Sequence, residues 1–415
     1  MREFGFSRSS LATILFTTVT LMGVLGWNPW GSVSTSHAEP APEAAFGGRT
    51  EIGPDGPLIG IRFETGLWNL TFAAEPGVSI RVQTQTAQWS LPSPIVVLAR
   101  EGVLKVSGLS FDEEIRFHAD SGPLFCQGME LAGKIECWKT DSGGWDLFER
   151  TSMEKYLPGV LVKEVSAHSF PPAALRAQAV AARTYALFQI QVRSGRPQRW
   201  HVHSSTRSQM YQGIGKIPAK IQQAVEDTRG QVLMTDGHVF ESFFHSTCGG
   251  VTCSVKTGFN LIPMAALSSV KCGGCRDAKY FRWKLEIPES ILREAIAKVT
   301  GPNGIRLGRI RQVKPVDVDD AGYVPYLEIR HDEGSLEIST RRLRASLSSL
   351  TPKVSLRSIA FDVTRNEKKF IFHGRGYGHG VGMCQNGARG QARAGKTHEE
   401  ILSHFYRGTE LRTLW

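Results

Sequence analysis

The pattern of hydrophobic and polar residues divides the chain into two parts of different kind. Between residues 58 and 145, apolar and polar residues alternate over short runs that are separated by turn residues, which is typical of half-buried β-strands. The expected strands cover 59–64, 79–82, 95–98, 103–106 and 115–119, with a hairpin turn at Glu101-Gly102. This part is therefore predicted to be a small β-rich domain.

At Thr151 the spacing of the apolar residues becomes helical. A short helix is predicted over residues 153–162, and a longer one opens at Ser169-Phe170-Pro171-Pro172 and ends at Gly195. One face of the longer helix is mostly alanine, so another element is expected to pack closely on it. The residues of this face are Leu175, Ala179, Ala182, Ala186 and Ile190.

Two local signals complete the expected secondary structure. Residues 231–244 form a predicted hairpin around Asp236-Gly237, and Thr397-His398-Glu399-Glu400 is a capping box that starts a terminal helix. The resulting fold class is α+β. A β-rich N-terminal domain over residues 58–145 is followed by a mixed α+β catalytic domain over residues 146–415.

The N-terminal residues resemble an export signal. Arg2 and Arg8 flank an apolar run over residues 11–27, and Ser36-His37-Ala38 fits a small-x-small cleavage site. Residues 1–38 are thus predicted to be a cleaved signal peptide or, alternatively, a membrane anchor held through residues 11–27, and residues 39–57 a linker. Both alternatives place the protein outside the cytoplasm, in the periplasm, in the cell wall or on the outer face of the membrane.

The chain carries a formal net charge of +10. A basic exported protein is expected to meet anionic surfaces such as cell-wall polymer, lipid headgroups or nucleic acid. No nucleic-acid-binding motif accompanies the charge, so a nucleic-acid partner is not predicted. The densest basic group, Arg341-Arg342-Leu343-Arg344, is interpreted as a solvated face.

The cysteines suggest a metal site. His245 and Cys248 form one short pair and Cys272 and Cys275 another, which is the spacing of a tetrahedral zinc site with one histidine and three cysteines. Four protein ligands close the metal shell, so the zinc would be structural, and no organic cofactor is predicted. Disulfide bonds are the alternative, with Cys253 as a further candidate. Cys126 and Cys137 form another possible disulfide pair.

Three other segments carry candidate chemistry. Glu164 lies among apolar residues, where desolvation would raise the pKa of its carboxyl and suit it to donate a proton; alternatively it is an ordinary carboxylate paired with Lys163 or Arg183. Gln209 and Tyr211 offer an amide and a phenol to sugar hydroxyls. The tail has glycine at every second position from 374 to 382, which predicts a functional loop holding His373 and His379 in fixed directions.

Taken together, these residues resemble the stage II sporulation protein D family, which also includes the amidase enhancers. The resemblance extends from about Trp145 to the C-terminus and rests on three stretches in the family's order. These are Tyr156 to Glu164 continuing into Ala174 to Ala186, then Gln209-Met210-Tyr211 followed by Phe244 to Gly250, and finally Gly376 to Met383.

The resemblance implies a lytic transglycosylase that cleaves peptidoglycan strands already stripped of stem peptides by an amidase. Glu164 matches the family glutamate that acts as general acid and then as general base. The sugar's own C6 hydroxyl is the nucleophile, so the product carries a 1,6-anhydro muramyl end and one carboxyl group suffices. Arg183, Gln209, Tyr211 and His379 are expected to hold the glycan. The family also binds zinc through histidine and cysteine, which favours the predicted metal site.

Two departures from the family and two alternative functions remain open. Residues 164–168 read Glu-Val-Ser-Ala-His where the family commonly has Glu-Met-Pro, and Cys384 stands where serine is usual.

The first alternative function is a non-catalytic wall-binding module that enhances an amidase. The second is a zinc hydrolase with His379 or His373 on an open metal site.

Overall fold

The computed structural model describes residues 52–63, 68–100, 102–196, 199–301, 307–351 and 354–415. The predicted signal or anchor, residues 1–38, lies outside them, as does most of the linker. Within these described ranges, no helix combines the length and the apolar character needed to cross a membrane. Three separate hydrophobic cores organise the described residues, and their mixture of helices and strands confirms the α+β prediction.

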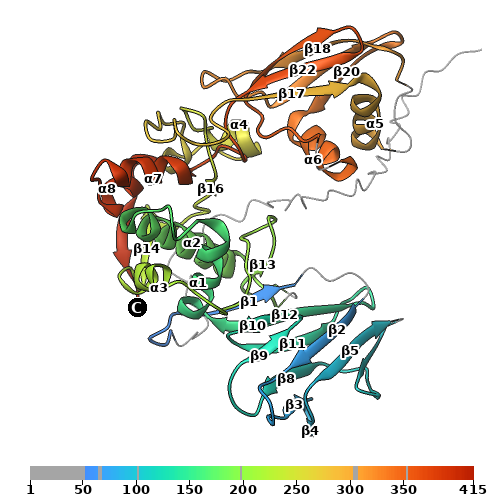
Figure 1. Ribbon diagram of the computed structural model, residues 1–415, viewed down its shortest axis with the longest axis vertical. Helices are drawn as coiled ribbons and strands as arrows, with labels where there is room; N and C mark the ends of the chain where they lie inside the picture. Colours follow the sequence, from blue (N-terminus) through green and yellow to red (C-terminus); the bar gives the residue numbers. More distant parts are fainter. Residues whose placement is uncertain (1–51, 64–67, 101, 197–198, 302–306, 352–353) are drawn as a thin grey trace, which may run out of the picture. The chain divides into compact units, whose positions relative to one another are not determined.

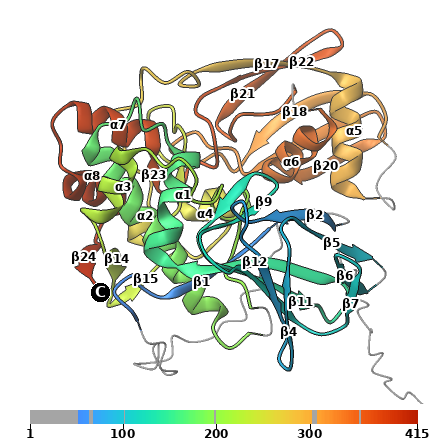
Figure 2. The same ribbon diagram turned by 60° about the horizontal axis from the view of Figure 1, so that its bottom comes forward.

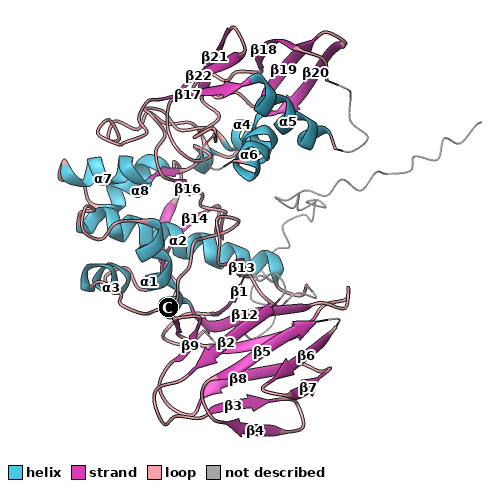
Figure 3. Cartoon of the chain, turned by 45° about the vertical axis from the view of Figure 1, so that its right-hand side comes forward, coloured by secondary structure: helices cyan, strands magenta, loops and turns pink. Residues whose placement is uncertain are grey.

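The first core lies between two sheets built almost entirely from residues 58–152 (Figure 3). One sheet has the order β13-β1-β12-β11-β8-β3-β4 and the other β10-β9-β2-β5-β6-β7. Alternate residues of both sheets point inward, and the rings of Phe72 and Phe117 stack across the core at 5.4 Å. The strands are β1 (Leu58–Arg62), β2 (Trp68–Ala73), β3 (Ile80–Gln83), β4 (Gln88–Leu91), β5 (Ile95–Arg100), β6 (Val103–Val106), β7 (Leu109–Phe111), β8 (Ile115–Ala119), β9 (Leu124–Cys126), β10 (Met129–Leu131), β11 (Lys134–Lys139), β12 (Trp145–Ser152) and β13 (Val202–His203).

This region agrees closely with the alternation of its sequence. The predicted strands 103–106 and 115–119 coincide with β6 and β8, and β5 turns into β6 at Gly102, whose φ is +77°. Glu101 of the predicted turn lies outside the described residues. Cys126 and Cys137 both lie in the core as free thiols.

The second core is built around one long helix. α1 (Met153–Glu164) ends near α2 (Pro172–Arg193), and the buried alanine face of α2 packs against α1, α3, α7 and α8, as the sequence predicts. Figures 1 and 2 both show α7 and α8 beside α2, although they lie far apart in the sequence. The remaining elements are α3 (Ala219–Glu226), β14 (Gln231–Thr235), β15 (His238–Val239), β16 (Phe244–His245), α4 (Val255–Phe259), a 3₁₀ turn (Ala265–Leu267), β23 (Met383–Cys384), α7 (Gln385–Arg393), α8 (His398–Phe405) and β24 (Glu410–Thr413).

Both local turn and cap predictions are confirmed here. β14 and β15 pair through a tight turn in which Asp236 and Gly237 both have positive φ, although the hairpin ends at Val239 and β16 pairs elsewhere. The capping box at Thr397 and Glu400 is present at the start of α8.

A buried ion pair ties α1 to α2 in this core. Arg183 is fully buried, and its Nε and Nη2 donate to the two carboxylate oxygens of Glu154 at 2.9 and 2.8 Å. Glu154 Oε1 also accepts from the Gly230 amide and the Trp415 indole. The pair therefore fixes the packing of α1, the helix that ends at Glu164.

We expect Arg183→Met to lower the free energy of unfolding by about 3–5 kcal/mol, because it leaves the Glu154 carboxylate buried without a cation. Urea denaturation measures this loss. In the double variant Arg183→Met/Glu154→Gln much of the stability should return, since the buried charge is gone. A raised KM with unchanged stability would instead indicate that Arg183 contacts substrate.

Residues 283–374 form the third core, inserted into the second. β17 pairs with β22 so that Trp283 lies opposite Gly374. The chain therefore enters and leaves this module at two residues that are paired in the sheet. The predicted domain 146–415 thus contains two cores. The elements are β17 (Trp283–Pro288), α5 (Glu289–Thr300), β18 (Ile310–Val316), β19 (Tyr326–His331), β20 (Gly334–Ser339), α6 (Thr340–Leu350), β21 (Phe361–Asn366) and β22 (Lys369–Gly374).

The basic run 341–344 lies on α6 of this module. Arg342 is exposed, as expected of a solvated face, although its guanidinium donates to the Val299 carbonyl. Arg344 is half-buried and donates to the Leu356 carbonyl, and Arg341 lies over the ring of Phe259. The run therefore serves packing as well as solvation.

Candidate functional site

Glu164 is the last residue of α1, at the edge of the second core. Its Oε1 accepts a hydrogen bond of 2.9 Å from the backbone amide of Met210. Burial raises the pKa of this carboxyl, while the Met210 amide and the side chain of Gln385 act in the opposite direction. The predicted pairing with Lys163 or Arg183 is absent from the described structure, and neither forms an ion pair with Glu164.

The loop that supplies the Met210 amide is held by buried side chains on either side. Gln209 is fully buried, accepting from the Tyr156 hydroxyl at 3.0 Å and donating to the Ala182 carbonyl. Tyr211 packs its ring against Tyr156 at 5.3 Å and is also buried. These residues position the main chain beside Glu164.

Glycine at position 159 makes this close approach possible. A Cβ on Gly159 would lie 2.2 Å from the Gly213 carbonyl oxygen and 2.6 Å from the Tyr211 ring, distances that no side chain can occupy. The Leu-Pro-Gly stretch of α1 therefore lets the 209–213 loop lie directly on the helix.

Four cysteine sulfurs gather in the second core, and one of them belongs to Cys384, the residue directly before α7. Sγ atoms of Cys248, Cys272, Cys275 and Cys384 all lie within 4.8 Å of one another, and all four residues are buried. Cys248 Sγ and Cys275 Sγ are 3.6 Å apart. A tetrahedral zinc site with Zn–S bonds of about 2.3 Å separates its sulfurs by about 3.8 Å, so the donor set fits zinc.

The backbone around the cluster also suits thiolates. The amides of Cys248 and Gly387 donate to Cys384 Sγ at 3.3 and 3.2 Å, and the Gly250 amide donates to Cys248 Sγ at 3.4 Å. Hydrogen bonds from the neighbouring thiols lower the pKa of Cys275. A Cβ on Gly387 would lie 2.3 Å from Cys272 Sγ, so α7 packs directly against the cluster.

Cys384 is thus the fourth member of the group, and His245 lies outside it. Parallel pairing of β16 with β23 places His245 opposite Cys384, but the His245 ring turns toward the glycine loop, where Nδ1 donates to the Val381 carbonyl at 3.0 Å. Its Nε2 is buried without a hydrogen-bond partner among the described residues. The structure therefore corrects the predicted set of one histidine and three cysteines to four cysteines. Cys253 is buried outside the group as a free thiol.

The glycine loop holds His379 rigidly, as the sequence predicts. His379 Nε2 donates to the Phe244 carbonyl at 2.8 Å and Nδ1 accepts from the Val381 amide at 3.1 Å. Burial holds the pKa of this imidazole well below its ordinary value. Both nitrogens are therefore engaged, which leaves none for the open metal site of the zinc-hydrolase alternative. His373 is exposed on β22.

Close backbone approach explains the glycines of this loop. Gly382 has a φ of +70°, and a Cβ there would lie 1.9 Å from the Phe243 carbonyl oxygen. The loop can thus lie against residues 243–245 and carry Cys384 to the other three cysteines.

The four residues expected to hold the glycan, Arg183, Gln209, Tyr211 and His379, all make contacts within the protein. Arg183 and Gln209 are fully buried and Tyr211 nearly so, and each is engaged in packing or internal hydrogen bonds. These three side chains therefore pack inside the core, and they expose almost no surface that a glycan could contact. Gln385 was missed: it is the first residue of α7, and its buried Nε2 makes no hydrogen bond of normal geometry with any described residue.

Comparison with known proteins adds independent evidence. The stage II sporulation protein family matches residues 141–234, which include α1, Glu164 and α2, and a domain of unknown function (DUF8618) matches residues 264–382. An uncharacterized protein of Brachyspira hyodysenteriae is 32% identical over 63% of this chain and 66% of its own length. The stage II sporulation protein D of Bacillus subtilis is 28% identical over 63% of this chain and 75% of its own length.

The amidase enhancer of Bacillus subtilis is 27% identical over 61% of this chain but only 40% of its own length. These matches support a cell-wall-related function for the chain. The stage II sporulation protein domain and these relatives support a family that joins stage II sporulation protein D and the amidase enhancer.

Proposed function

We propose that this chain is an exported peptidoglycan lytic transglycosylase that acts on peptide-stripped glycan strands. Glu164 would donate its proton to the glycosidic oxygen as the bond to C1 breaks. The resulting carboxylate would then take the proton of the muramyl C6 hydroxyl, whose oxygen bonds to C1 and closes the 1,6-anhydro ring. The proton returns to Glu164, so one carboxyl group serves both steps.

The environment of Glu164 is the observation that carries this proposal. Burial raises the pKa of its carboxyl, which favours the protonated form needed for the first step. The Met210 amide at 2.9 Å stabilises the carboxylate that the first step leaves behind. Within the described residues, the groups that shift this pKa do not include a carboxylate, in keeping with a mechanism that needs no second acid.

We further propose that the four cysteines hold a structural zinc ion. Four thiolates close the metal shell, so the ion would stabilise the fold and take no part in the chemistry. Cys384 is followed directly by Gln385, the residue beside Glu164. The cluster would therefore fix the start of α7 against the catalytic glutamate.

Product analysis tests the proposed reaction. The purified chain, lacking residues 1–38, is incubated with amidase-treated peptidoglycan, and the fragments are examined by mass spectrometry. Anhydro-muramyl ends are expected. Reducing ends without the anhydro mass would indicate a hydrolase instead, and absence of any cleavage would overturn the enzymatic proposal.

The rate of cleavage is expected to fall as pH rises through a pKa above the ordinary glutamate range. The reason is that the raised pKa of Glu164 keeps the acid form at pH values where exposed glutamates are ionised, and this form is lost above that pKa. A pH profile of the cleavage rate at saturating glycan measures this limb. A rate that rises with pH over the same range would contradict a general acid role.

A non-catalytic enhancer of a cell-wall amidase is the second candidate, and the similarity to the amidase enhancer supports it. An amidase would in addition be the partner that supplies stripped strands to the transglycosylase. The two functions are separated by adding the chain to an amidase reaction. An enhancer would accelerate release of stem peptides, and it would do so equally well with Glu164→Gln.

A further inference from the structure

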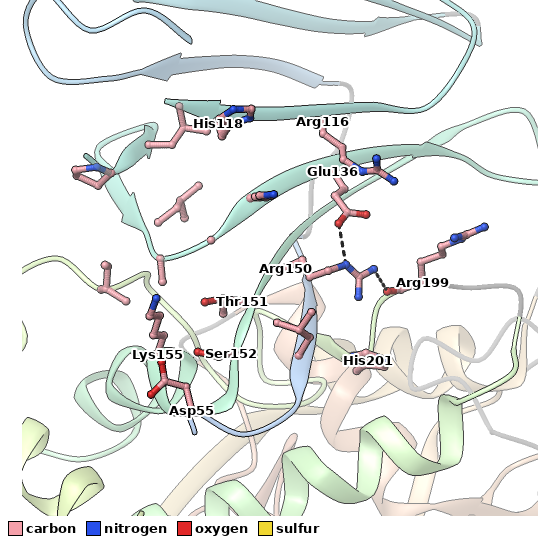
Figure 4. Close-up of a pocket in the computed structure, with 18 of the residues that line it drawn as sticks. Asp55, Arg116, His118, Glu136, Arg150, Thr151, Ser152, Lys155, Arg199 and His201 are labelled. Carbon is pink, nitrogen blue, oxygen red and sulfur yellow. Dashed lines mark hydrogen bonds and ion pairs between the residues drawn. The ribbon is translucent and has the colours of Figure 1, made fainter. Parts of the chain in front are cut away.

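A large cavity of the described structure lies against the seven-stranded sheet, and Glu164 is not among the residues that line it. Its volume is about 1530 Å³, beyond the roughly 300–1,000 Å³ typical of small-molecule pockets, so it has room for a segment of a polymer. Residues of β8, β11 and β12 line it, together with Lys155 of α1, the end of α2 and the segment before β13 (Figure 4). Sheet pairing of β1 with both β12 and β13 joins these walls.

Positive charge dominates this cavity, named here the basic cleft. Its lining contains seven arginines and lysines but only three acidic residues. The cationic residues are Arg116, Lys134, Arg150, Lys155, Arg193, Arg196 and Arg199, and the acidic ones are Asp55, Glu130 and Glu136. The cleft therefore has an excess of positive charge.

Two of the three acids are already satisfied. Glu136 accepts from Arg150 Nε at 2.8 Å and from the Trp138 indole at 2.9 Å, and Asp55 pairs with Arg229. In contrast, Arg116, Lys134 and Lys155 make no ion pair with any residue that the structure describes. These three cations are therefore available to a ligand.

The cleft also contains an aromatic ring and two hydroxyl groups. The Arg199 guanidinium lies 3.6 Å from the ring centre of Trp138, while Arg150 Nη2 donates to the Arg199 carbonyl. Next to Arg150 on the same strand, the hydroxyls of Thr151 and Ser152 are buried and lack hydrogen-bond partners among the described residues (Figure 4). Hydrogen-bonding capacity therefore remains unused next to the free cations.

We propose that the basic cleft binds a stretch of glycan strand whose muramyl groups carry free carboxylates. An amidase that removes the stem peptide turns the amide on each muramyl residue into a carboxylate, so a stripped strand carries a regular row of carboxylates directly on its sugars, where a peptide-bearing strand has amides. The cleft would thus recognise stripped strands through charge complementarity. This inference rests on the proposed function for the identity of the strand.

Charge density favours such a glycan over a phosphate polymer or nucleic acid. A stripped strand carries one carboxylate per disaccharide, with neutral sugars between. The cations of the cleft are likewise dispersed over several elements, and Glu130 lies among them. A polymer with a phosphate in every unit would place more negative charge against that carboxylate.

Binding to insoluble peptidoglycan tests the proposal without cleavage. The parent is Glu164→Gln, and its affinity is measured on amidase-treated and untreated material over a series of salt concentrations. The test variant adds Arg116→Ala, Lys134→Ala and Lys155→Ala. The matched control adds Lys298→Ala, Lys314→Ala and Lys368→Ala, three exposed lysines of the inserted module. Thermal unfolding verifies that both variants fold.

We expect the parent to bind treated peptidoglycan at least tenfold more tightly than untreated material, with a preference that declines as salt increases. The cleft variant should lose that preference, and the control should change by less than twofold. Equal binding by the cleft variant and the parent would overturn the proposal, as would tighter binding to polyphosphate or DNA than to stripped glycan. Because these measurements use an inactive parent, failure of cleavage by the wild type would count against the proposed function alone.

Discussion

Replacing Glu164 with glutamine is expected to lower the rate of glycan cleavage by about 10²–10⁴-fold while leaving glycan binding intact. Glutamine keeps the shape of the side chain and can still accept the Met210 amide, but it has no proton to donate at the leaving oxygen. Release of anhydro-muramyl fragments, followed over time for both proteins, measures the effect. Glu241→Gln is the matched control.

Glu241 suits this comparison because its carboxyl is also buried, with a pKa raised to about 7, and it accepts a hydrogen bond from Gln189 at 2.8 Å. Its replacement should leave most of the activity. Full activity in Glu164→Gln would remove Glu164 from the mechanism. Equal loss in both variants would point to two cooperating carboxyl groups and hence to a hydrolase.

Loss of the proposed zinc ion is expected to unfold the second core. Structural zinc contributes about 10–16 kcal/mol of apparent binding free energy in small zinc domains, and that energy is folding energy. A strong chelator should therefore lower the melting temperature and abolish cleavage together. Cys384→Ser should weaken zinc binding by more than the ~10–100-fold that loss of an outer-shell partner costs.

Two variants separate the possible ligand sets in this experiment. Cys253→Ala removes a buried thiol outside the cluster, so zinc content should be unchanged. His245→Gln should also retain zinc, because the histidine bonds to the Val381 carbonyl. Loss of zinc from His245→Gln but not from Cys384→Ser would restore the set with one histidine and three cysteines.

Local sequence patterns were sufficient for much of the fold. Short apolar runs bounded by turn residues located β6 and β8, the Asp236-Gly237 pair located a hairpin turn, and the capping box located α8. These features depend on residues that are neighbours in the chain. The separate core of residues 283–374 was not predicted, because its strands are ordinary and only the pairing of Trp283 with Gly374 defines its limits.

The distinction between neighbouring and distant residues also explains which residues of the candidate site could be predicted. Glu164 could be singled out because a charged residue among apolar ones is visible in the sequence. Cys384 could not be assigned to the metal set, since parallel pairing of β16 with β23 brings it to Cys248 across a long stretch of chain. The burial of Arg183 was equally hidden, because its partner Glu154 lies on another helix. The only feature of the sequence that could have indicated a role for Gln385 is its position directly after Cys384.

The inserted module also sets an order of events during synthesis. Cys248, Cys272 and Cys275 all precede residues 283–374, and Cys384 follows them. A nascent chain therefore holds three of the four thiols of the cluster for the whole time that the module is being made, and the fourth arrives last. Because N-terminal segments emerge and fold first, the module can fold before the cluster closes. Closure of the cluster is thus a late step, and until then the three earlier thiols are open to oxidation.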